Sequence, residues 1–379
     1  MFGLTKTNAV LGIDIGATSV KIVELKSAGG KPVLVNYAYS ESSPANLAQA
    51  NQQINTAAIA DIIIKLCAKA EITTDRAVAA MPSFSVFTSV LHIANPGKKP
   101  EELQAAVLWE AKKVVPLALE EMMLDWQKVE DTTVPSSMPP ASTKKQNTTK
   151  APPKSNTSSA PAGGINVLLT GAPKNLVKKY IDIFKAANLH LVSLETEMFS
   201  LIRSLIGSNP AVIALVDLGA VNTDIAIVEN GLPLFTRSLD VGGIMVTRAI
   251  ASALQVDFKR AEQFKFDLGM VGTTDQAPDK GDMPPVIKNT LAPIINEIRY
   301  SLNLFQQENN KKIDKVVLAG GGAGLIGLSP YLSAVLGINV VIGDPWARIS
   351  YPENLTAVLE EISFRMAIAA GLALREVVS

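Results

Sequence analysis

Two stretches of the chain repeat one pattern: VLGIDIGATSVKIVEL at residues 10–25 and ALVDLGAVNTDIAIVENG at residues 214–231. Each begins with an apolar strand that carries an aspartate near its end, Asp14 in one copy and Asp217 in the other. An apolar residue, a glycine and a short turn follow, and then a second apolar strand that reaches Val-Glu. Copies this far apart are not the units of a solenoid, so the pattern indicates a duplicated domain.

The repeated turn has the chemistry of a phosphate site. A tight hairpin containing glycine turns its backbone N–H groups inward and forms an anion nest, to which Ser and Thr hydroxyls add donors. A carboxylate at the strand end would repel phosphate unless a divalent cation lies between them. Two facing loops of this kind would clamp a polyphosphate with one Mg²⁺. One copy alone would also fit an ordinary turn, because Asp and Gly are common turn residues.

A third glycine-rich loop, Gly320–Gly324, follows the apolar strand Val316–Ala319 and precedes a helix that begins near Ser329. Only glycine lets the backbone lie flat against a base or ribose, so this loop suits a nucleotide. It lacks the spacing G-x-G-x-x-G with a following acid, and the chain has no G-x-x-x-x-G-K-[ST]. A Rossmann fold and a P-loop ATPase are therefore the poorer interpretations.

Composition narrows the class further. The 379 residues include 35 Lys+Arg and 35 Asp+Glu, and this zero net charge disfavours a nucleic-acid-binding protein. The sequence contains no run of 18 apolar residues, so we predict no membrane-spanning helix. One cysteine and two distant histidines cannot form a zinc cluster or an internal disulfide. The N-terminus lacks the pattern of a secretory signal, so we expect a cytoplasmic protein.

Residues 131–164 contain six prolines and two large aliphatic side chains, and we expect a disordered loop there. Predicted strands at 122–129 and 165–170 flank it, so the loop interrupts a folded domain. The remaining sequence alternates strands with helices, including a helix over 100–115 that has acidic residues first and lysines last. These patterns predict an α/β chain in two halves.

These motifs resemble those of the actin and sugar-kinase ATPase superfamily over nearly the whole chain. Residues 14–19 resemble its first phosphate loop, 217–224 its second and 320–323 its adenosine motif. Residues 194–206 and 365–375 resemble its two connecting helices, and 261–265 the helix that reaches the ribose and base. The resemblance implies an actin-like ATPase fold: duplicated ribonuclease-H-like subdomains with an inserted small α/β subdomain like subdomain 1C of the cell-division protein FtsA.

The resemblance also implies a site for ATP and Mg²⁺. We expect Asp14 and Asp217 to bind the metal and Glu197 to be the catalytic residue, orienting a water for slow hydrolysis at most. The residues expected to bind the nucleotide are Asp14, Gly16, Ala17, Thr18, Ser19, Lys21, Asp217, Gly219, Asn222, Thr223, Gly242, Gly243, Glu262, Lys265, Gly320, Gly321 and Gly322.

Within the superfamily, the opening FGL, the motif LGIDIGATSVKIVEL and LWEAKKVVP at residues 108–116 resemble the PilM family of type IV pilus assembly. This implies a cytoplasmic scaffold, peripheral to the inner membrane, that docks the N-terminal cytoplasmic peptide of a PilN-like membrane protein and meets other pilus components. Membrane association would then be indirect. We expect no nucleic-acid partner. The alternatives are a small-molecule kinase of the same superfamily and an FtsA-like cell-division protein.

The resemblance divides the chain as follows. Residues 1–84 form subdomain 1A together with the C-terminal helix at 361–379. Residues 85–190 form the inserted subdomain 1C, which contains the loop 131–164. Residues 191–360 form the second actin-like half, subdomains 2A and 2B.

Overall fold

The computed structural model describes residues 9–40, 55–94, 96–97, 99–115, 117–129, 164–267 and 284–378. The expected disordered loop at 131–164 lies outside the described residues except for Gly164. The chain forms two compact units, Met1–Phe84 with Lys178–Ser379, and Ser85–Val177. The subdomain boundaries at 84, 190 and 360 remain predictions from the sequence.

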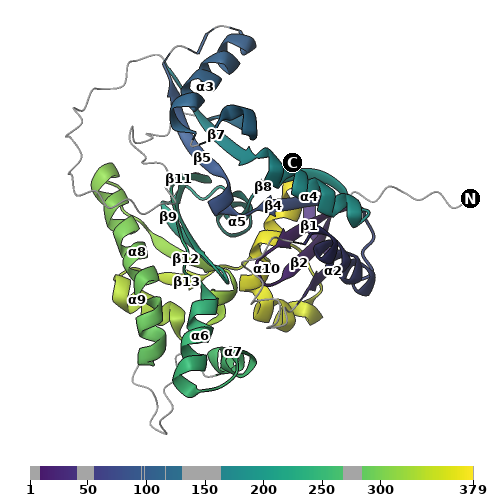
Figure 1. Ribbon diagram of the computed structural model, residues 1–379, viewed down its shortest axis with the longest axis vertical. Helices are drawn as coiled ribbons and strands as arrows, with labels where there is room; N and C mark the ends of the chain where they lie inside the picture. Colours follow the sequence, from purple (N-terminus) through teal and green to yellow (C-terminus); the bar gives the residue numbers. More distant parts are fainter. Residues whose placement is uncertain are drawn as a thin grey trace, which may run out of the picture. The chain divides into compact units, whose positions relative to one another are not determined.

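The first unit contains two sheets with the same topology (Figure 1). The order β3-β2-β1-β4-β8 of one sheet matches the order β11-β10-β9-β12-β13 of the other. In each, two antiparallel pairs are followed by two parallel ones. The duplicated α/β halves predicted from the repeat are therefore confirmed. The strands are β1 Ala9–Ile15, β2 Val20–Ala28, β3 Lys31–Tyr39, β4 Arg76–Met81, β8 His190–Thr196, β9 Ile213–Leu218, β10 Thr223–Glu229, β11 Leu232–Leu239, β12 Lys315–Ala319 and β13 Val340–Ile342.

The central strands β1 and β9 are buried along their whole length. Both sides of these strands are covered, so their sequences are nearly continuous apolar runs instead of alternating ones. Asp14 and Asp217 break these runs, each one residue before its strand ends. A carboxylate is rarely buried without a partner. These two positions therefore call for a functional explanation.

Helices cover both sheets of the first unit. Side chains from α6, α8 and α9 form one apolar core with the second sheet, including Val246, Ile294, Ile298 and Leu332. The helices are α2 Thr56–Lys69, α4 Lys174–Ala186, α5 Glu197–Leu201, α6 Gly243–Leu254, α7 Phe258–Asp267, α8 Pro285–Asn309, α9 Leu328–Leu336 and α10 Thr356–Val377. Among the described residues, none of the helices is long and apolar enough to cross a membrane.

Helix α10 joins the two halves, as expected of a connecting helix. Its apolar side chains share one core with β1 and β2 of the first sheet and β9 and β12 of the second. At Gly371 the helix meets α5 so closely that an added Cβ would lie 2.0 Å from the carbonyl oxygen of Ser200. The Ser200 hydroxyl donates to the Ile368 carbonyl at 2.6 Å. Small side chains are therefore required at this crossing.

The second unit is a small three-stranded sheet with one helix packed on it (Figure 1). The strand order is β5-β7-β6, with both neighbours antiparallel to β7. Helix α3 buries Val107 and Ala111 against this sheet, and its Trp109 is 65% exposed. The elements are β5 Phe87–Ile93, α3 Pro100–Val114, β6 Met122–Val129 and β7 Ile165–Pro173.

Candidate functional site: a carboxylate cluster between glycine turns

The β1–β2 hairpin holds the first candidate phosphate loop. Asp14 and Lys21 face each other in the register of the two strands, and Lys21 Nζ lies 2.8 Å from Asp14 Oδ2. The turn closes when the Gly16 amide donates to the Ser19 carbonyl at 3.0 Å, with Ala17 exposed at its tip. Burial would lower the pKa of Lys21, but Asp14 and then Asp217 and Glu197 outweigh burial and raise it. Lys21 is therefore a fixed positive charge at this loop.

The β9–β10 hairpin holds the second loop, and the start of α6 is bonded to it. The amides of Gly243 and Ile244 donate to the carbonyls of Gly219 and Ala220, both at 2.9 Å. The Thr223 hydroxyl donates to the Val241 carbonyl at 2.7 Å, so it braces this loop. The sequence suggested Thr223 as a phosphate donor, whereas the structure gives its hydroxyl a backbone partner.

The glycine loop after β12 lies directly against Asp217. Gly320 has a φ of +80°, and a Cβ there would lie 2.2 Å from Asp217 Oδ1. Only glycine fits both the backbone angle and the close approach. The third predicted loop is therefore part of the same site as the second.

Three buried carboxylates, Asp14, Asp217 and Asp224, and the half-buried Glu197 gather where these loops meet. Burial raises the pKa of Asp217 to about 7, and the charges of Asp224 and Asp14 add to the rise. Burial also raises the pKa of Asp224 to about 6, although bonds from Ser238 and Asn222 oppose the shift. One lysine, Lys21, offsets only part of this negative charge.

Glu197 belongs to this cluster through the strand that precedes it. It is the first residue of α5, directly after β8, and its Oε2 accepts a hydrogen bond from the Ser83 amide at 3.1 Å. Burial and the charges of Asp14, Asp217 and Asp224 raise its pKa well above the usual carboxyl range. A carboxyl group with a raised pKa in a buried site is suited to accept or share a proton.

The cluster fits a divalent cation bound through water. Within the described part of the chain, no three Asp, Glu, His or Cys side chains come close enough to hold a metal directly. Mg²⁺ commonly keeps several waters and takes one or two carboxylates plus substrate phosphates. Burial and neighbouring carboxylates raise the pKa values of Glu197 and Asp217, and a hydrated Mg²⁺ would favour the charged forms of both groups. Asp14 and Asp217 remain the proposed metal-binding residues.

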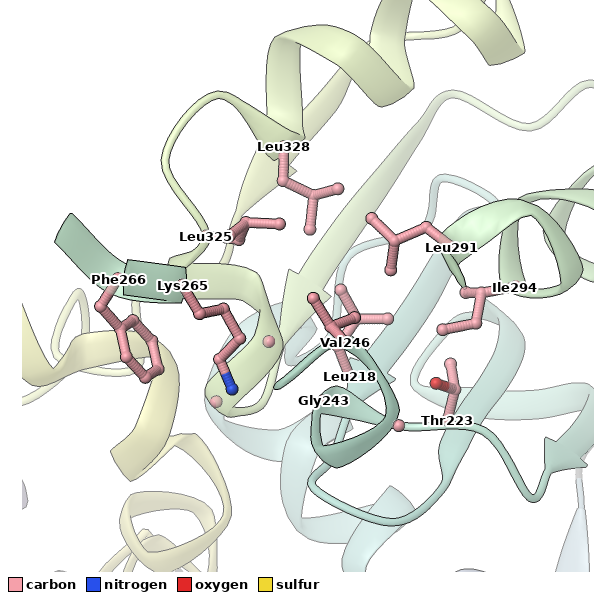
Figure 2. A pocket seen from close by; sticks show the side chains of 13 residues that line it. Leu218, Thr223, Gly243, Val246, Lys265, Phe266, Leu291, Ile294, Leu325 and Leu328 are labelled. Atoms are coloured by element: carbon pink, nitrogen blue, oxygen red, sulfur yellow. The ribbon is translucent and has the colours of Figure 1, made fainter. Parts of the chain in front are cut away.

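A pocket opens beside the second and third loops (Figure 2). The empty space within it is about 390 Å³, a figure that includes open solvent at the mouth. Its lining brings together six of the residues predicted from the sequence: Thr223, Gly242, Gly243, Lys265, Gly321 and Gly322. Leucine and isoleucine side chains form the opposite wall. The pocket therefore combines an apolar wall with flat glycine backbone, as a purine ring requires.

Lys265 and Glu262 lie on one face of α7, as their spacing predicted. Lys265 Nζ lies 2.7 Å from Glu262 Oε1 and 3.0 Å from Thr247 Oγ1. The Thr247 hydroxyl also donates to Glu262. Burial lowers the pKa of Lys265, although Glu262 opposes the shift. This polar group stands at the pocket and offers both a donor and an acceptor to a ligand with hydroxyl groups.

Two residues of the site were missed from the sequence. Asp224 is the second residue of β10, and its buried carboxylate accepts from Asn222 Nδ2 at 2.7 Å. Its position in the quoted repeat was a signal that could have identified it. Ser83 had no such signal, because it reaches Glu197 only through the pairing of β4 with β8.

The duplicated sheets and the cluster between glycine turns define an actin-like ATPase fold. Two solved structures share this fold at low identity. MreB 5 of Spiroplasma citri bound to AMPPNP has a TM-score of 0.50 and 12% identity, covering 97% of this chain and 95% of that one. The ethanolamine utilization protein EutJ from Carboxydothermus hydrogenoformans has a TM-score of 0.51 and 16% identity, covering 97% and 89%.

A family model identifies the chain more specifically than the fold does. The model of the type IV pilus assembly protein PilM matches residues 12–139 and 154–377, and the chain belongs to this family. The solved PilM-PilN type IV pilus biogenesis complex has a TM-score of 0.77 at 25% identity, covering 97% of this chain and 98% of that chain.

Cell division protein FtsA of Pseudomonas aeruginosa is 30% identical over 152 residues. FtsA of Borreliella burgdorferi is 29% identical over 180 residues. These matches cover 36% and 43% of this chain, and the chain spans 36% and 42% of the length of these two relatives. They support the resemblance to FtsA over part of the chain.

Proposed function

We propose that this protein is an ATP- and Mg²⁺-binding scaffold of the type IV pilus inner-membrane assembly complex. The observation that carries the proposal is the set of carboxylates near Lys21, which lie at three glycine-containing turns, together with the adjoining pocket that residues of the second and third turns line. A buried group of acids is costly in isolation. Phosphates with Mg²⁺ would neutralise it, and backbone amides would bind the phosphate oxygens.

Different residues of the site would bind the phosphates, the base and the ribose of the nucleotide. The hairpin turns at residues 16–19 and 219–223 would hold the phosphates, and Lys21 would contact them. Asp14 and Asp217 would orient the hydrated metal. Glycines 320–322 and the apolar wall would take the base, while Glu262 and Lys265 would meet the ribose. Mg²⁺ would supply charge neutralisation of the phosphates.

Glu197 gives the site the means for slow hydrolysis. Its carboxylate is held by the Ser83 amide at the edge of the cluster, where it would orient a water toward the terminal phosphate. Burial and the charges of Asp14 and Asp217 raise the pKa of Glu197, and a bound cation would oppose that shift. We therefore propose, at most, a slow ATPase whose nucleotide state orders the scaffold.

The proposed partner is the N-terminal cytoplasmic peptide of a PilN-like inner-membrane protein. A member of the same family has been solved as a PilM-PilN complex. Docking of this kind would place the protein on the cytoplasmic side, peripheral to the inner membrane, and bring it to other pilus components. Attachment to the membrane would then depend on the partner.

Two measurements test this function separately. Fluorescence titration with a labelled ATP analogue should show binding in Mg²⁺ that falls at least tenfold in EDTA. Fractionation of cells should place the protein with membranes only when the PilN-like partner is present. Membrane association that persists without the partner would contradict the proposed docking, and equal nucleotide binding in EDTA would contradict the metal site.

A further inference from the structure

Ser83 lies where three strands of the first sheet end. It follows β4 after Pro82, and β4 lies between β1 and β8 in the sheet. The neighbouring strands carry Asp14 at the end of β1 and lead into Glu197 after β8. Parallel strands end at the same edge, so Ser83 stands among the carboxylates of the site. Its amide donates to Glu197 Oε2 at 3.1 Å.

The hydroxyl of the same residue has no evident structural use. Ser83 Oγ is buried and has no hydrogen-bond partner among the residues that the structure describes. Leaving a buried hydroxyl unpaired costs about 1–3 kcal/mol. Because the hydroxyl is joined to its amide nitrogen through Cα and Cβ, it lies close to the carboxylate that the amide binds. A water or a ligand oxygen held at Glu197 would supply the partner that this hydroxyl lacks.

We propose that Ser83 is a further catalytic residue of the site: its amide fixes Glu197, and its hydroxyl holds the water that Glu197 orients. This inference rests on the proposed function, since it requires ATP in the site. In the step, the water oxygen bonds to the terminal phosphorus while the bond from that phosphorus to the bridging oxygen breaks. The electron pair of the broken bond stays on ADP, and the water's proton passes to Glu197.

The environment of Glu197 suits this step. Burial and three neighbouring carboxylates raise its pKa, so the group accepts a proton more readily than an exposed glutamate does. A single carboxylate leaves the water free to rotate about one hydrogen bond. A second bond from Ser83 would fix the water's direction, and orientation of this kind contributes strongly to rate.

Ser301 provides a matched control. Its hydroxyl on α8 is also buried and without a hydrogen-bond partner among the described residues, but it packs within the apolar core of the second sheet. Replacing either serine by alanine removes an unpaired polar group, so neither change should lower the melting temperature by more than about 2 °C. A merely structural Ser83 would therefore behave like Ser301 in every measurement.

The test compares Mg·ATP with the transition-state mimic Mg·ADP·AlF₄⁻ in equilibrium titrations of the full chain. We expect the wild-type protein to bind ADP more tightly when AlF₄⁻ is present. Ser83→Ala should lose about tenfold of that gain, the effect of one hydrogen bond, and should bind Mg·ATP within twofold of the wild type. Ser301→Ala should match the wild type, and Ser83→Thr should restore most of the gain.

Other results would overturn the inference. These are a wild-type protein that gains nothing from AlF₄⁻, a Ser83→Ala variant equal to the wild type, or a Ser83→Ala variant whose loss appears equally in Mg·ATP binding. If the wild-type protein does not bind Mg·ATP, the proposed function fails first and the inference falls with it. Phosphate release measured in parallel should show a lower kcat and an unchanged KM in Ser83→Ala.

Discussion

Lys21 and Asp14 face each other across the first hairpin, with Nζ 2.8 Å from Oδ2 and both side chains largely buried. Two further carboxylates, Asp217 and Glu197, also raise the pKa of Lys21, so this lysine balances more charge than that of Asp14 alone. Breaking a buried pair by removing one partner leaves an uncompensated charge. In this protein, removal of Lys21 would leave the negative charge of the whole carboxylate cluster uncompensated.

Lys21→Met should therefore destabilise the protein without nucleotide by about 3 kcal/mol at pH 7.5. The loss should be smaller at pH 5, where the carboxyls with raised pKa are protonated. Urea unfolding measures both values. Lys178→Met removes an exposed pair with Asp182 and should change the free energy of unfolding by less than about 0.5 kcal/mol. Equal effects of the two changes would contradict the charge balance.

The raised pKa of Asp217 predicts how stability depends on pH. The folded state holds the Asp217 proton up to about pH 7, whereas an unfolded aspartate loses it near pH 4. Between about pH 4 and pH 7 the folded state therefore binds more protons than the unfolded state. The contribution of Asp217 to the free energy of unfolding is complete below about pH 4 and is lost as the pH rises through 7. Asp217→Asn should gain stability over the wild type by a few kcal/mol between these values.

Urea unfolding of both proteins from pH 4.5 to 8 measures this difference. The comparison isolates Asp217, because the remaining acids are common to both proteins. A difference that does not grow with pH would show that Asp217 ionises normally. Adding Mg²⁺ and ATP should remove most of the slope in the wild type.

Residues whose role depends on the local sequence were predicted well. The strands at both ends of each repeat follow from their apolar runs, and the glycine turns follow from the motif. The first connecting helix was expected over 194–206, but β8 continues through Thr196 because Leu194, Glu195 and Thr196 pair with β4. Helix α5 begins at Glu197 and ends in a π-helical turn at Ile202–Ile206.

Residues whose role depends on the meeting of distant strands were not predictable. Ser83 reaches Glu197 across 114 positions of sequence, and no local pattern marks it. The Thr223 hydroxyl suits phosphate by type, but its burial directs it to the Val241 carbonyl. The sequence alone specifies which residue types are present, whereas the tertiary structure determines their partners.

Gly371→Ala tests the crossing of α10 and α5. The added Cβ would lie 2.0 Å from the Ser200 carbonyl oxygen, so a helix must shift. We expect a loss of about 3 kcal/mol or more in the free energy of unfolding. Gly321→Ala is the control, because nothing lies within 4 Å of its added Cβ. It should fold normally yet weaken nucleotide binding, since Gly321 lines the pocket.

Deletion of residues 133–162 should leave a folded, nucleotide-binding protein. Val129 of β6 pairs with Asn166 of β7, so the ends of the deleted stretch come from neighbouring strands and a short glycine-containing turn can join them. The PilM family model also skips residues 140–153. Thermal unfolding should shift by only a few degrees. A large drop in the midpoint, or loss of soluble protein, would show that the segment supports the fold.

The most direct test of the nucleotide site is calorimetric titration of the full chain with ATP at pH 7, in Mg²⁺ and in EDTA, using buffers of different ionisation enthalpy. Asp217 has a pKa of about 7 and is partly protonated before the metal enters. We predict tight binding only in Mg²⁺, with protons released as the cation enters, and a smaller release in Asp217→Asn, in which Glu197 and Asp224 keep raised pKa values. Absence of binding in Mg²⁺, or equal binding in EDTA without proton release, would contradict the account.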